Sequence, residues 1–497
     1  MLLDHSVFVD EMSKHFLNPS DLDIETDKPQ EACGVFGVLA AEGDVAKLVY
    51  FGLYALQHRG QESAGITVYD DRGNTHTHKA MGLVSQVFNE TILAELKGSL
   101  AIGHNRYSTT GSSKVCNAQP IVVNTRLGDF SLAHNGNLVN ATELRGELSA
   151  QGHALESTTD SEGIAFAVGE AVAEGKDWQE AIVTALHRCH GAFSLVMAMP
   201  NAIAGARDAY GVRPLVIGKT TDGSYVLSSE TCGLDIIGAE YVREVAAGEL
   251  VIITMEGGIQ SLIWEVAKPK LCAFEMIYFA RPDSVMHGES LYTYRMRIGG
   301  ELAKESPVDA DIVIGVPDSG IPAAIGFSRE SGIPYAEGLI KNRYVGRTFI
   351  QPTQAMREAG IKMKLNPLKD VLQGKRVIVI DDSIVRGTTS RKIVRALREA
   401  GATEVHMRIS SPPVTHPCFY GIDTDSQDNL IASHNSVEAI AKQIEVDSLA
   451  YLSHDAMLIA TRIDTANFCT ACFTGKYPIE IPDKLKRSKL MLESTAP

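Results

Sequence analysis

The sequence contains no long uninterrupted apolar segment. No run of about 18 apolar residues occurs in the chain, which excludes a conventional membrane-spanning helix. Positive charge is also scarce, because 46 Lys and Arg stand against 61 Asp and Glu, giving a net charge of −15. Such an acidic chain lacks the basic surface that non-specific nucleic-acid binding requires. Residues 1–32 contain neither arginine nor an apolar core of signal-peptide length, so we expect no secretory or transit signal and a cytoplasmic protein.

Cysteine is sparse as well. Eight cysteines in 497 residues predict thiols, metal ligands or nucleophiles and argue against a disulfide framework. Only Cys469 and Cys472 form a C-x-x-C pair; the single ones are Cys33, Cys116, Cys189, Cys232, Cys272 and Cys418. A chain of 497 residues also exceeds one ordinary hydrophobic core, so we expect two or more domains.

The pattern of apolar residues changes near residue 270. Before about 262, short apolar segments such as "FSLAHNGNLV" and "ELVIITMEGG" are separated by turn residues, which predicts a strand-rich domain with helices at 161–174 and 178–189. Later, the strands "DIVIGVP" and "RVIVIDD" alternate with a helix that begins at 321 and another at 390–400. Continuous β-branched strands alternating with helices indicate a parallel sheet covered on both faces.

Residues 376–401 carry the most specific local signal. A buried strand over 377–380 ends at Asp381 and Asp382, and a loop containing Gly387 and three hydroxyl residues leads into a helix. Ligands of open α/β sheets bind outside the carboxyl ends of the strands, and a helix N-terminus favours phosphate. Two adjacent acids suit ribose hydroxyls and hydrated Mg²⁺. Taken alone, the acids also fit a Rossmann-like turn with an acidic N-cap.

The whole run resembles the 5-phosphoribosyl-1-pyrophosphate (PRPP) signature of the type I phosphoribosyltransferases. Nearby, "IGVPDSG" suits pyrophosphate and metal, and the basic segment 341–364 fits either a lid over phosphates or a solvated charged loop. The resemblance implies the PRPP ligands Asp381, Asp382, Arg386, Gly387, Thr388, Thr389, Lys341 and Lys364, and the Mg²⁺ ligands Ser319, Asp381 and Asp382.

Polar motifs also punctuate the strands of the first half, namely "NRYST", "AHNGNL" and "STTDSE". A thiol that attacks an amide needs oxyanion donors, a base and partners for the charges of the substrate. Asn135 and the backbone N–H of Gly136 could supply the donors, Arg106 could pair with an α-carboxylate, and Asp160 with an α-ammonium group. Free glutamine fits this set. Each motif alone is ordinary, since Asn-Gly is usually a hairpin turn.

Together with "CGVFG" at 33–37 and "LQHRGQESAGI" at 56–66, these motifs resemble the class II glutamine amidotransferase domain, an αββα N-terminal-nucleophile fold. The resemblance implies the nucleophile Cys33, the glutamine-binding residues Arg59, Arg106 and Asp160, and the oxyanion donors Asn135 and Gly136. In such enzymes the base is the free α-amino group of the nucleophile, which titrates near ~8. We therefore expect residues 1–32 to be a propeptide that is cleaved between Ala32 and Cys33.

Both resemblances together, from about residue 31 to about 480, are those of the amidophosphoribosyltransferase family. The family fold is an N-terminal-nucleophile glutaminase domain followed by an α/β type I phosphoribosyltransferase domain. We expect a propeptide at 1–32, the two domains at 33–262 and 263–480, and a tail at 481–497. The implied reaction converts PRPP, glutamine and water to 5-phosphoribosylamine, pyrophosphate and glutamate, with channelled ammonia. Feedback inhibition by purine nucleotides and a homotetramer are implied as well.

Cys272, Cys418, Cys469 and Cys472 form a possible ligand set. A C-x-x-C with two distant thiols can hold Zn²⁺ or an iron–sulfur cluster, and spacing does not separate the two. One branch of the family, which includes Bacillus-type enzymes, carries a structural 4Fe-4S cluster at these positions, and the resemblance therefore favours the cluster over zinc. We expect Cys116, Cys189 and Cys232 to be ordinary buried or semi-buried thiols.

Two other functions fit part of the sequence. A PRPP-dependent salvage enzyme would bind a nucleobase and would not need Cys33, Arg106, Asn135 and Asp160 together. A regulatory PRPP-sensing protein would keep the phosphate loop and lose turnover. The basic segment and the complete set of glutamine-site residues count against the second alternative.

Overall fold

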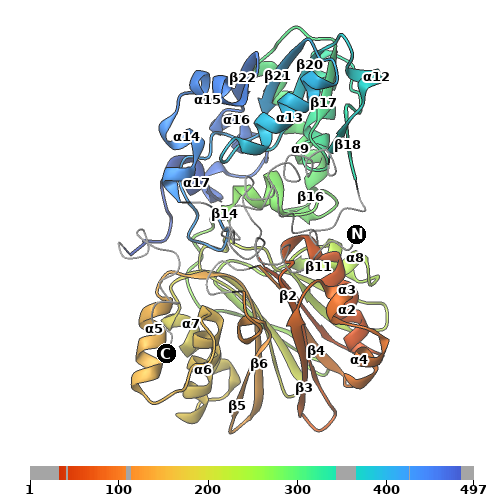
Figure 1. Ribbon diagram of the computed structural model, residues 1–497. Helices are drawn as coiled ribbons and strands as arrows, with labels where there is room; N and C mark the ends of the chain where they lie inside the picture. Colours follow the sequence, from red (N-terminus) through yellow and green to blue (C-terminus); the bar gives the residue numbers. More distant parts are fainter. Residues whose placement is uncertain (1–32, 41–42, 108–112, 343–364, 425, 483–497) are drawn as a thin grey trace, which may run out of the picture.

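The computed structural model describes residues 33–40, 43–107, 113–342, 365–424 and 426–482. The lower half in Figure 1 contains two antiparallel sheets between layers of helices. In the first sheet the order is β11-β9-β10-β1-β4-β2-β3, and the strands are β1 Gly34–Leu39, β2 Ser63–Tyr69, β3 Thr75–Met81, β4 Leu100–Arg106, β9 Val216–Lys219, β10 Tyr225–Ser228 and β11 Glu240–Glu244. In the second sheet the order is β13-β12-β8-β7-β6-β5, and the strands are β5 Ile121–Thr125, β6 Gly128–Leu138, β7 Gly191–Met199, β8 Ala202–Arg207, β12 Glu249–Thr254 and β13 Gly258–Ile263.

The alternation of β1 shows why the two sheets stack. Val35 and Leu39 point into the core between the sheets, whereas Phe36 and Val38 point outward. The outward residues pack under α2 (Val45–Ala55), with α3 (Val84–Val87) and α4 (Glu90–Glu95) beside it. The second sheet is covered by α5 (Ala141–Ala150), α6 (Asp160–Ala173) and α7 (Trp178–Arg188). The helices predicted at 161–174 and 178–189 correspond to α6 and α7.

The upper half in Figure 1 contains a parallel sheet of order β17-β20-β21-β22. Its strands are β17 Ile312–Gly315, β20 Arg376–Asp381, β21 Glu404–Ile409 and β22 Ser448–Tyr451. Ile378 and Ile380 face α9 (Leu291–Glu305) and α10 (Ile321–Ser331), while Val377 and Val379 face α13 (Thr388–Glu399) and α15 (Val437–Ile444). Helices thus cover both faces. The two halves together confirm the predicted fold class, and the helices expected at 321 and 390–400 correspond to α10 and α13.

Short elements fill the junction between the halves. β14 (Leu271–Cys272) pairs in parallel with β23 (Phe468–Cys469), and a π-helical turn over Glu275–Phe279 follows β14. The remaining short elements, which are distributed over both halves, are α8 Cys232–Asp235, β15 Val285–Met286, β16 Glu289–Ser290, β18 Leu339–Lys341, β19 Leu365–Pro367, α12 Lys369–Leu372, α14 Ile431–His434, α16 His454–Ile459, α17 Ala471–Thr474 and the 3₁₀ turns Gln57–Arg59, Val115–Asn117, Gln427–Asn429 and Thr465–Asn467. Within the described ranges, no helix combines the length and apolarity needed to cross a membrane.

Candidate active site

Cys33 precedes β1, which lies between β10 and β4 in the first sheet. The residue is 6% exposed, and its thiol donates a hydrogen bond to the Tyr107 carbonyl oxygen over 3.5 Å. Burial raises the pKa of the Cys33 thiol, and this hydrogen bond and the charge of Arg106 oppose the rise. The thiol is therefore protonated at neutral pH and needs a base before it can act as a nucleophile.

The sheet register brings Arg106 close to this thiol. Gly34 lies opposite Asn105 in the antiparallel β1–β4 pair, so the end of β4 reaches the start of β1. Arg106 is buried, and its Nη1 atom is 3.5 Å from the Glu62 carboxylate. A buried guanidinium beside a thiol is suited to pairing with the carboxylate of a small substrate.

Asn135 and Gly136 lie in β6 of the second sheet and are fully covered. A Cβ on Gly136, whose φ is +148°, would lie 2.0 Å from the Ala192 carbonyl oxygen, so this strand position accepts only glycine. Both polar atoms of the Asn135 amide are buried and have no hydrogen-bond partner among the described residues. A buried amide without partners is costly, which indicates that this one is available for a ligand.

Asp160 begins α6 and points back at the same strand. Its Oδ2 atom accepts a hydrogen bond from the Leu138 backbone N–H over 2.9 Å, and its Oδ1 atom lies 3.5 Å from His134 Nδ1. Burial alone would raise the pKa of Asp160, but the charge of His134 and these hydrogen bonds hold it below its usual value. The carboxylate is therefore negative at neutral pH and able to pair with an ammonium group.

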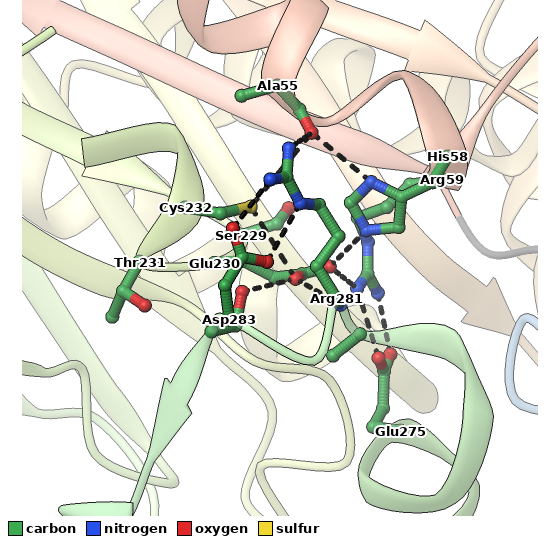
Figure 2. A network of polar contacts seen from close by, with 12 residues as sticks. Ala55, His58, Arg59, Ser229, Glu230, Thr231, Cys232, Glu275, Arg281 and Asp283 are labelled. Carbon is green, nitrogen blue, oxygen red and sulfur yellow. Dashed lines mark hydrogen bonds and ion pairs between the residues drawn. The ribbon is translucent and has the colours of Figure 1, made fainter. Parts of the chain in front are cut away.

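Arg59 has a set of partners that its local motif does not reveal. Its Nε atom donates to the Cys33 carbonyl oxygen over 3.1 Å, and its two terminal nitrogens form a bidentate pair with Glu275 at 2.6 and 3.0 Å. Glu230 accepts a further hydrogen bond at 2.5 Å, as Figure 2 shows. The guanidinium is thus committed to two buried carboxylates, and the predicted role of Arg59 in binding glutamine stays a prediction.

Glu230 and Glu275 were not among the predicted site residues. Glu230 also contacts His58 Nε2 at 2.7 Å and accepts from the Ser284 hydroxyl at 2.6 Å. Burial alone would raise the pKa of both acids, but the adjacent cations hold it low. A sequence signal did exist for Glu275, because it is the one acid in the apolar run "LCAFEMIYFA".

The second half positions its acidic pair at the carboxyl edge of the parallel sheet. Asp381 ends β20 and Asp382 follows, and both are buried. Asp381 Oδ1 accepts from the Asp382 backbone N–H over 2.9 Å, and Asp382 Oδ1 accepts from the Ser383 hydroxyl over 2.6 Å. Gly387 then caps the N-terminus of α13, whose first two residues are threonines.

The predicted pyrophosphate loop lies beside this acidic pair. β17 and β20 are parallel neighbours, and the Val316 N–H donates to the Ile380 carbonyl oxygen over 2.8 Å. The loop contains Ser319 and, before it, a cis peptide bond between Pro317 and Asp318. Lys341 pairs with Asp318 at 2.8 Å, which brings one predicted PRPP ligand to the rim of this loop. Lys364, another predicted PRPP ligand, lies outside the described residues.

Cys272, Cys418, Cys469 and Cys472 line one pocket at the junction between the halves. Cys272 lies opposite Cys469 in the β14–β23 pair, and the Tyr420 N–H donates to Cys418 Sγ over 3.3 Å. Burial raises the pKa of Cys272 to about 11, opposed by the charge of Arg213. Among the residues that the structure describes, no group of three or more His, Cys, Asp or Glu could hold a single metal ion.

The remaining cysteines separate into two kinds. Cys189 and Cys232 are buried, as expected, whereas Cys116 is exposed at the turn Val115–Asn117. The expectation of a covered thiol was therefore wrong for Cys116, because this turn lies on the surface.

Comparisons with known proteins match both halves. A glutamine amidotransferase domain matches residues 104–235, and a phosphoribosyl transferase domain matches residues 295–410. An amidophosphoribosyltransferase of Synechococcus elongatus is 68% identical over 480 residues, covering 95% of this chain and 97% of the relative. Another, of Mycobacterium bovis, is 50% identical and covers 94% of this chain and 90% of the relative.

A solved structure agrees with these relatives. The glutamine PRPP amidotransferase from B. subtilis complexed with ADP and GMP is 47% identical, with a TM-score of 0.85, and the match covers 91% of this chain and 98% of that one. Sequence and structure thus agree over nearly the full length of both halves. The chain belongs to the amidophosphoribosyltransferase family.

Proposed function

We propose that this protein converts PRPP, glutamine and water to 5-phosphoribosylamine, pyrophosphate and glutamate, the first committed step of de novo purine (IMP) synthesis. One observation carries the proposal: one half holds a buried thiol and a buried amide that has no hydrogen-bond partner among the described residues, and in the other half a buried acidic pair ends a parallel strand. Neither alternative function weighed from the sequence accounts for both.

The first half-reaction releases ammonia from glutamine. The free α-amino group of Cys33 accepts the thiol proton, and the sulfur attacks the γ-carboxamide carbon. Asn135 and the Gly136 N–H donate hydrogen bonds to the developing oxyanion. Ammonia leaves, a γ-glutamyl thioester forms, and water hydrolyses it to glutamate. Arg106 pairs with the α-carboxylate and Asp160 with the α-ammonium group, which the low pKa of Asp160 supports.

The second half-reaction replaces pyrophosphate by ammonia. Ammonia attacks C1 of the ribose, the bond from C1 to the pyrophosphate oxygen breaks, and the nitrogen loses a proton. Asp381 and Asp382 bind the ribose hydroxyls, and the lysines Lys341 and Lys364 bind pyrophosphate. The residues assigned to the 5-phosphate are Arg386, Gly387, Thr388 and Thr389, at the N-terminus of α13.

Mg²⁺ fits this edge of the sheet. Buried carboxylates are hard oxygen ligands, and Mg²⁺ commonly takes one or two of them together with substrate phosphates. Ser319, Asp381 and Asp382 would hold it, and the ion would neutralise charge on the leaving pyrophosphate. Such a site needs no group of three protein acids, in agreement with the described residues.

Ammonia has to pass between the two halves without meeting water, which would protonate it. Part of the junction is apolar, since Phe274, Phe279, Val385 and Leu430 belong to one buried cluster there. This cluster joins the strand β7 of the first half to the loop after Asp382, and it supports an internal route for ammonia.

The proposed domains are 33–262 and 263–480, with a tail at 481–497. The proposed propeptide at 1–32 lies outside the described residues.

We propose that the four cysteines hold a 4Fe-4S cluster, which the resemblance to the Bacillus-type branch favours over zinc. A C-x-x-C with two distant thiols could also hold Zn²⁺. The four thiols line a common pocket, which supports a shared bound group. Apolar neighbours such as Phe274 and Val414, and the N–H···S hydrogen bond to Cys418, also suit a buried cluster. The group would be structural, joining β14, the loop at Cys418 and α17.

Regulation and assembly follow the family. We propose that purine nucleotides inhibit the enzyme by binding over the PRPP site, as the ADP and GMP of the related B. subtilis complex suggest, and that the protein is a homotetramer. We also propose a cytoplasmic enzyme.

The function is tested with purified, anaerobically prepared protein supplied with PRPP, Mg²⁺ and glutamine. We expect pyrophosphate and glutamate to form in equal amounts, and ammonium chloride to replace glutamine as the nitrogen donor. A nucleobase-dependent release of pyrophosphate without glutamate would contradict the proposal in favour of a salvage enzyme. No turnover in protein with full iron content would favour a PRPP sensor.

Replacing Cys469 by serine is expected to remove iron and labile sulfide together and to destabilise the C-terminal region. Loss of a structural group that joins three segments should lower the thermal midpoint by about 10 °C, which corresponds to roughly 3 kcal/mol for a domain of this size. Iron, sulfide and zinc analysis with thermal unfolding checks this. Cys116→Ser, at the exposed thiol, is the control and should change neither quantity. Full activity and stability in iron-free, zinc-free protein would refute the cluster.

A further inference from the structure

A segment of the second half packs directly on the strand that carries the oxyanion donors. The Asn137 side-chain amide donates to the Phe419 carbonyl oxygen over 3.0 Å. Two residues on, Gly421 has a φ of +99°, and a Cβ placed on it would lie 2.9 Å from the Gly136 Cα and carbonyl carbon. Residues more than 280 positions apart are thus in backbone contact, without a side chain between them.

The segment Phe419–Gly421 is itself held firmly. Arg213 is fully buried, and its Nε atom donates to the Tyr420 carbonyl oxygen over 2.9 Å. The Tyr420 hydroxyl donates to the Ile479 carbonyl oxygen at 2.5 Å, and the Tyr420 N–H donates to Cys418 Sγ. The Ile479 N–H also donates to the Tyr420 hydroxyl over 3.0 Å, so four hydrogen bonds fix the residue immediately before Gly421.

Arg213, which holds Tyr420, is also connected to Cys33 through buried ion pairs. Arg213 pairs with Glu275 at 2.9 Å, Glu275 pairs with Arg59, and Arg59 donates to the Cys33 carbonyl oxygen. Figure 2 shows Arg59 between Glu230 and Glu275. The Cys33 backbone, next to the first sheet, and the Gly136 backbone, in the second, are consequently held by one connected set of residues from both halves.

We propose that Gly421 is a positioning residue for the glutaminase reaction. Because Gly421 has no side chain, the segment Phe419–Gly421 lies against Gly136 and sets the distance of the Asn135 and Gly136 donors from Cys33. This inference rests on the proposed function of those donors. None of the sequence motifs for glutamine or PRPP includes Gly421.

Gly136 has little room to yield to a side chain at position 421. It is already tightly packed on β7, because even a Cβ on Gly136 would lie 2.0 Å from the Ala192 carbonyl oxygen. An alanine at position 421 must therefore displace the Gly136 backbone, the segment Phe419–Gly421, or both by several tenths of an ångström. Oxyanion donors act only within about 2.7–3.1 Å of the oxyanion, so such a shift lowers the rate rather than the affinity for glutamine.

The test compares Gly421→Ala with Gly175→Ala. Gly175 has a φ of +102° and nothing within 4 Å of its Cβ position, so this control carries the same backbone strain without the contact. We expect Gly421→Ala to reduce kcat for glutamine hydrolysis by about 10- to 100-fold, with KM for glutamine, iron content and ammonia-dependent synthesis close to those of the control. Ammonia-dependent synthesis reports on the second half alone.

Two results would overturn the inference: a kcat for glutamine hydrolysis within twofold of the control, or equal losses of glutamine-dependent and ammonia-dependent synthesis. If Gly421→Ala yields no folded protein, the variant Asn137→Asp tests the inference instead. Aspartate has the size of asparagine and leaves the backbone unchanged, but it places a carboxylate against the Phe419 carbonyl oxygen. Asn137→Asp should show the same selective loss of kcat, and unchanged glutamine hydrolysis in this variant would overturn the inference. A wild-type protein without glutaminase activity would refute the proposed function and the inference together, whereas normal wild-type activity with unaffected variants refutes the inference alone.

Discussion

Replacing Cys33 by alanine is expected to reduce glutamine-dependent synthesis of phosphoribosylamine by about 10³-fold or more, because the reaction loses its nucleophile. Ammonia-dependent synthesis should stay within about twofold of wild type, since the PRPP site lies in the other half. Pyrophosphate release with each nitrogen donor, measured in parallel, gives both rates. The ratio of the two rates is the diagnostic quantity.

Cys189→Ala is the matched control for this variant. Cys189 has the same 6% exposure as Cys33, and its thiol donates to the Ala185 carbonyl oxygen in the last turn of α7. It should leave both rates unchanged apart from a small loss of stability. Glutamine-dependent synthesis that survives in Cys33→Ala would contradict the assignment of the nucleophile.

The active protein is also expected to begin at Cys33. Burial raises the pKa of the Cys33 thiol, so the proton has to be taken by a neighbouring base. A free α-amino group titrates near ~8 and can accept it, whereas a peptide nitrogen cannot. Intact mass measured on glutaminase-active protein checks this expectation. Full glutaminase activity in a chain that still begins at Met1 would contradict the propeptide.

Local signals in the sequence predicted much of this molecule. The helices at 161–174 and 178–189 emerge as Asp160–Ala173 and Trp178–Arg188, because apolar periodicity and caps are properties of neighbouring residues. The acidic pair at the end of β20 was likewise readable, because a β-branched run followed by Asp-Asp and a hydroxyl-rich turn lies within 15 residues. Such signals need no knowledge of the tertiary fold.

The buried ionic network could not be predicted in this way. Arg59 lies in a motif that suggested a substrate-binding cation, yet its partners Glu230 and Glu275 are 171 and 216 residues further along the chain. Arg213 lies in the first half as well, and its pairing with Glu275 appears only once the halves are docked. Removing one member of a buried ion pair leaves an uncompensated charge. The network therefore fixes both the position of Cys33 and the way in which the two halves dock.

Gly421 illustrates the same limit. A glycine in "CFYGID" looks like any turn glycine, and nothing local distinguishes it from Gly175 or Gly223. Its importance comes from the 2.9 Å approach to Gly136, which is a property of the tertiary structure alone. Close backbone contact between halves is therefore the feature that sequence motifs miss most readily.

Replacing Asp382 by asparagine should have the opposite pattern to Cys33→Ala. The amide keeps the size of the side chain and an oxygen that can accept the Ser383 hydroxyl, so the fold is preserved. What is lost is the charge that binds ribose hydroxyls and supports Mg²⁺, and hydrogen bonds to a charged group are worth about 1.5–3 kcal/mol each. We expect synthesis from glutamine and from ammonia to fall alike, by about 10²-fold or more.

Glutamine hydrolysis measured without PRPP should persist in Asp382→Asn, because Cys33 and the oxyanion donors belong to the other half. Asp428→Asn serves as the control, since this carboxylate in the same half is 94% exposed and should be dispensable. Equal thermal midpoints of the two variants would show that the loss of synthesis in Asp382→Asn does not come from unfolding. If either synthetic rate stayed within threefold of wild type, the assignment of Asp382 to the PRPP site would be contradicted. A selective loss of the glutamine-dependent rate would indicate instead that Asp382 couples the two half-reactions.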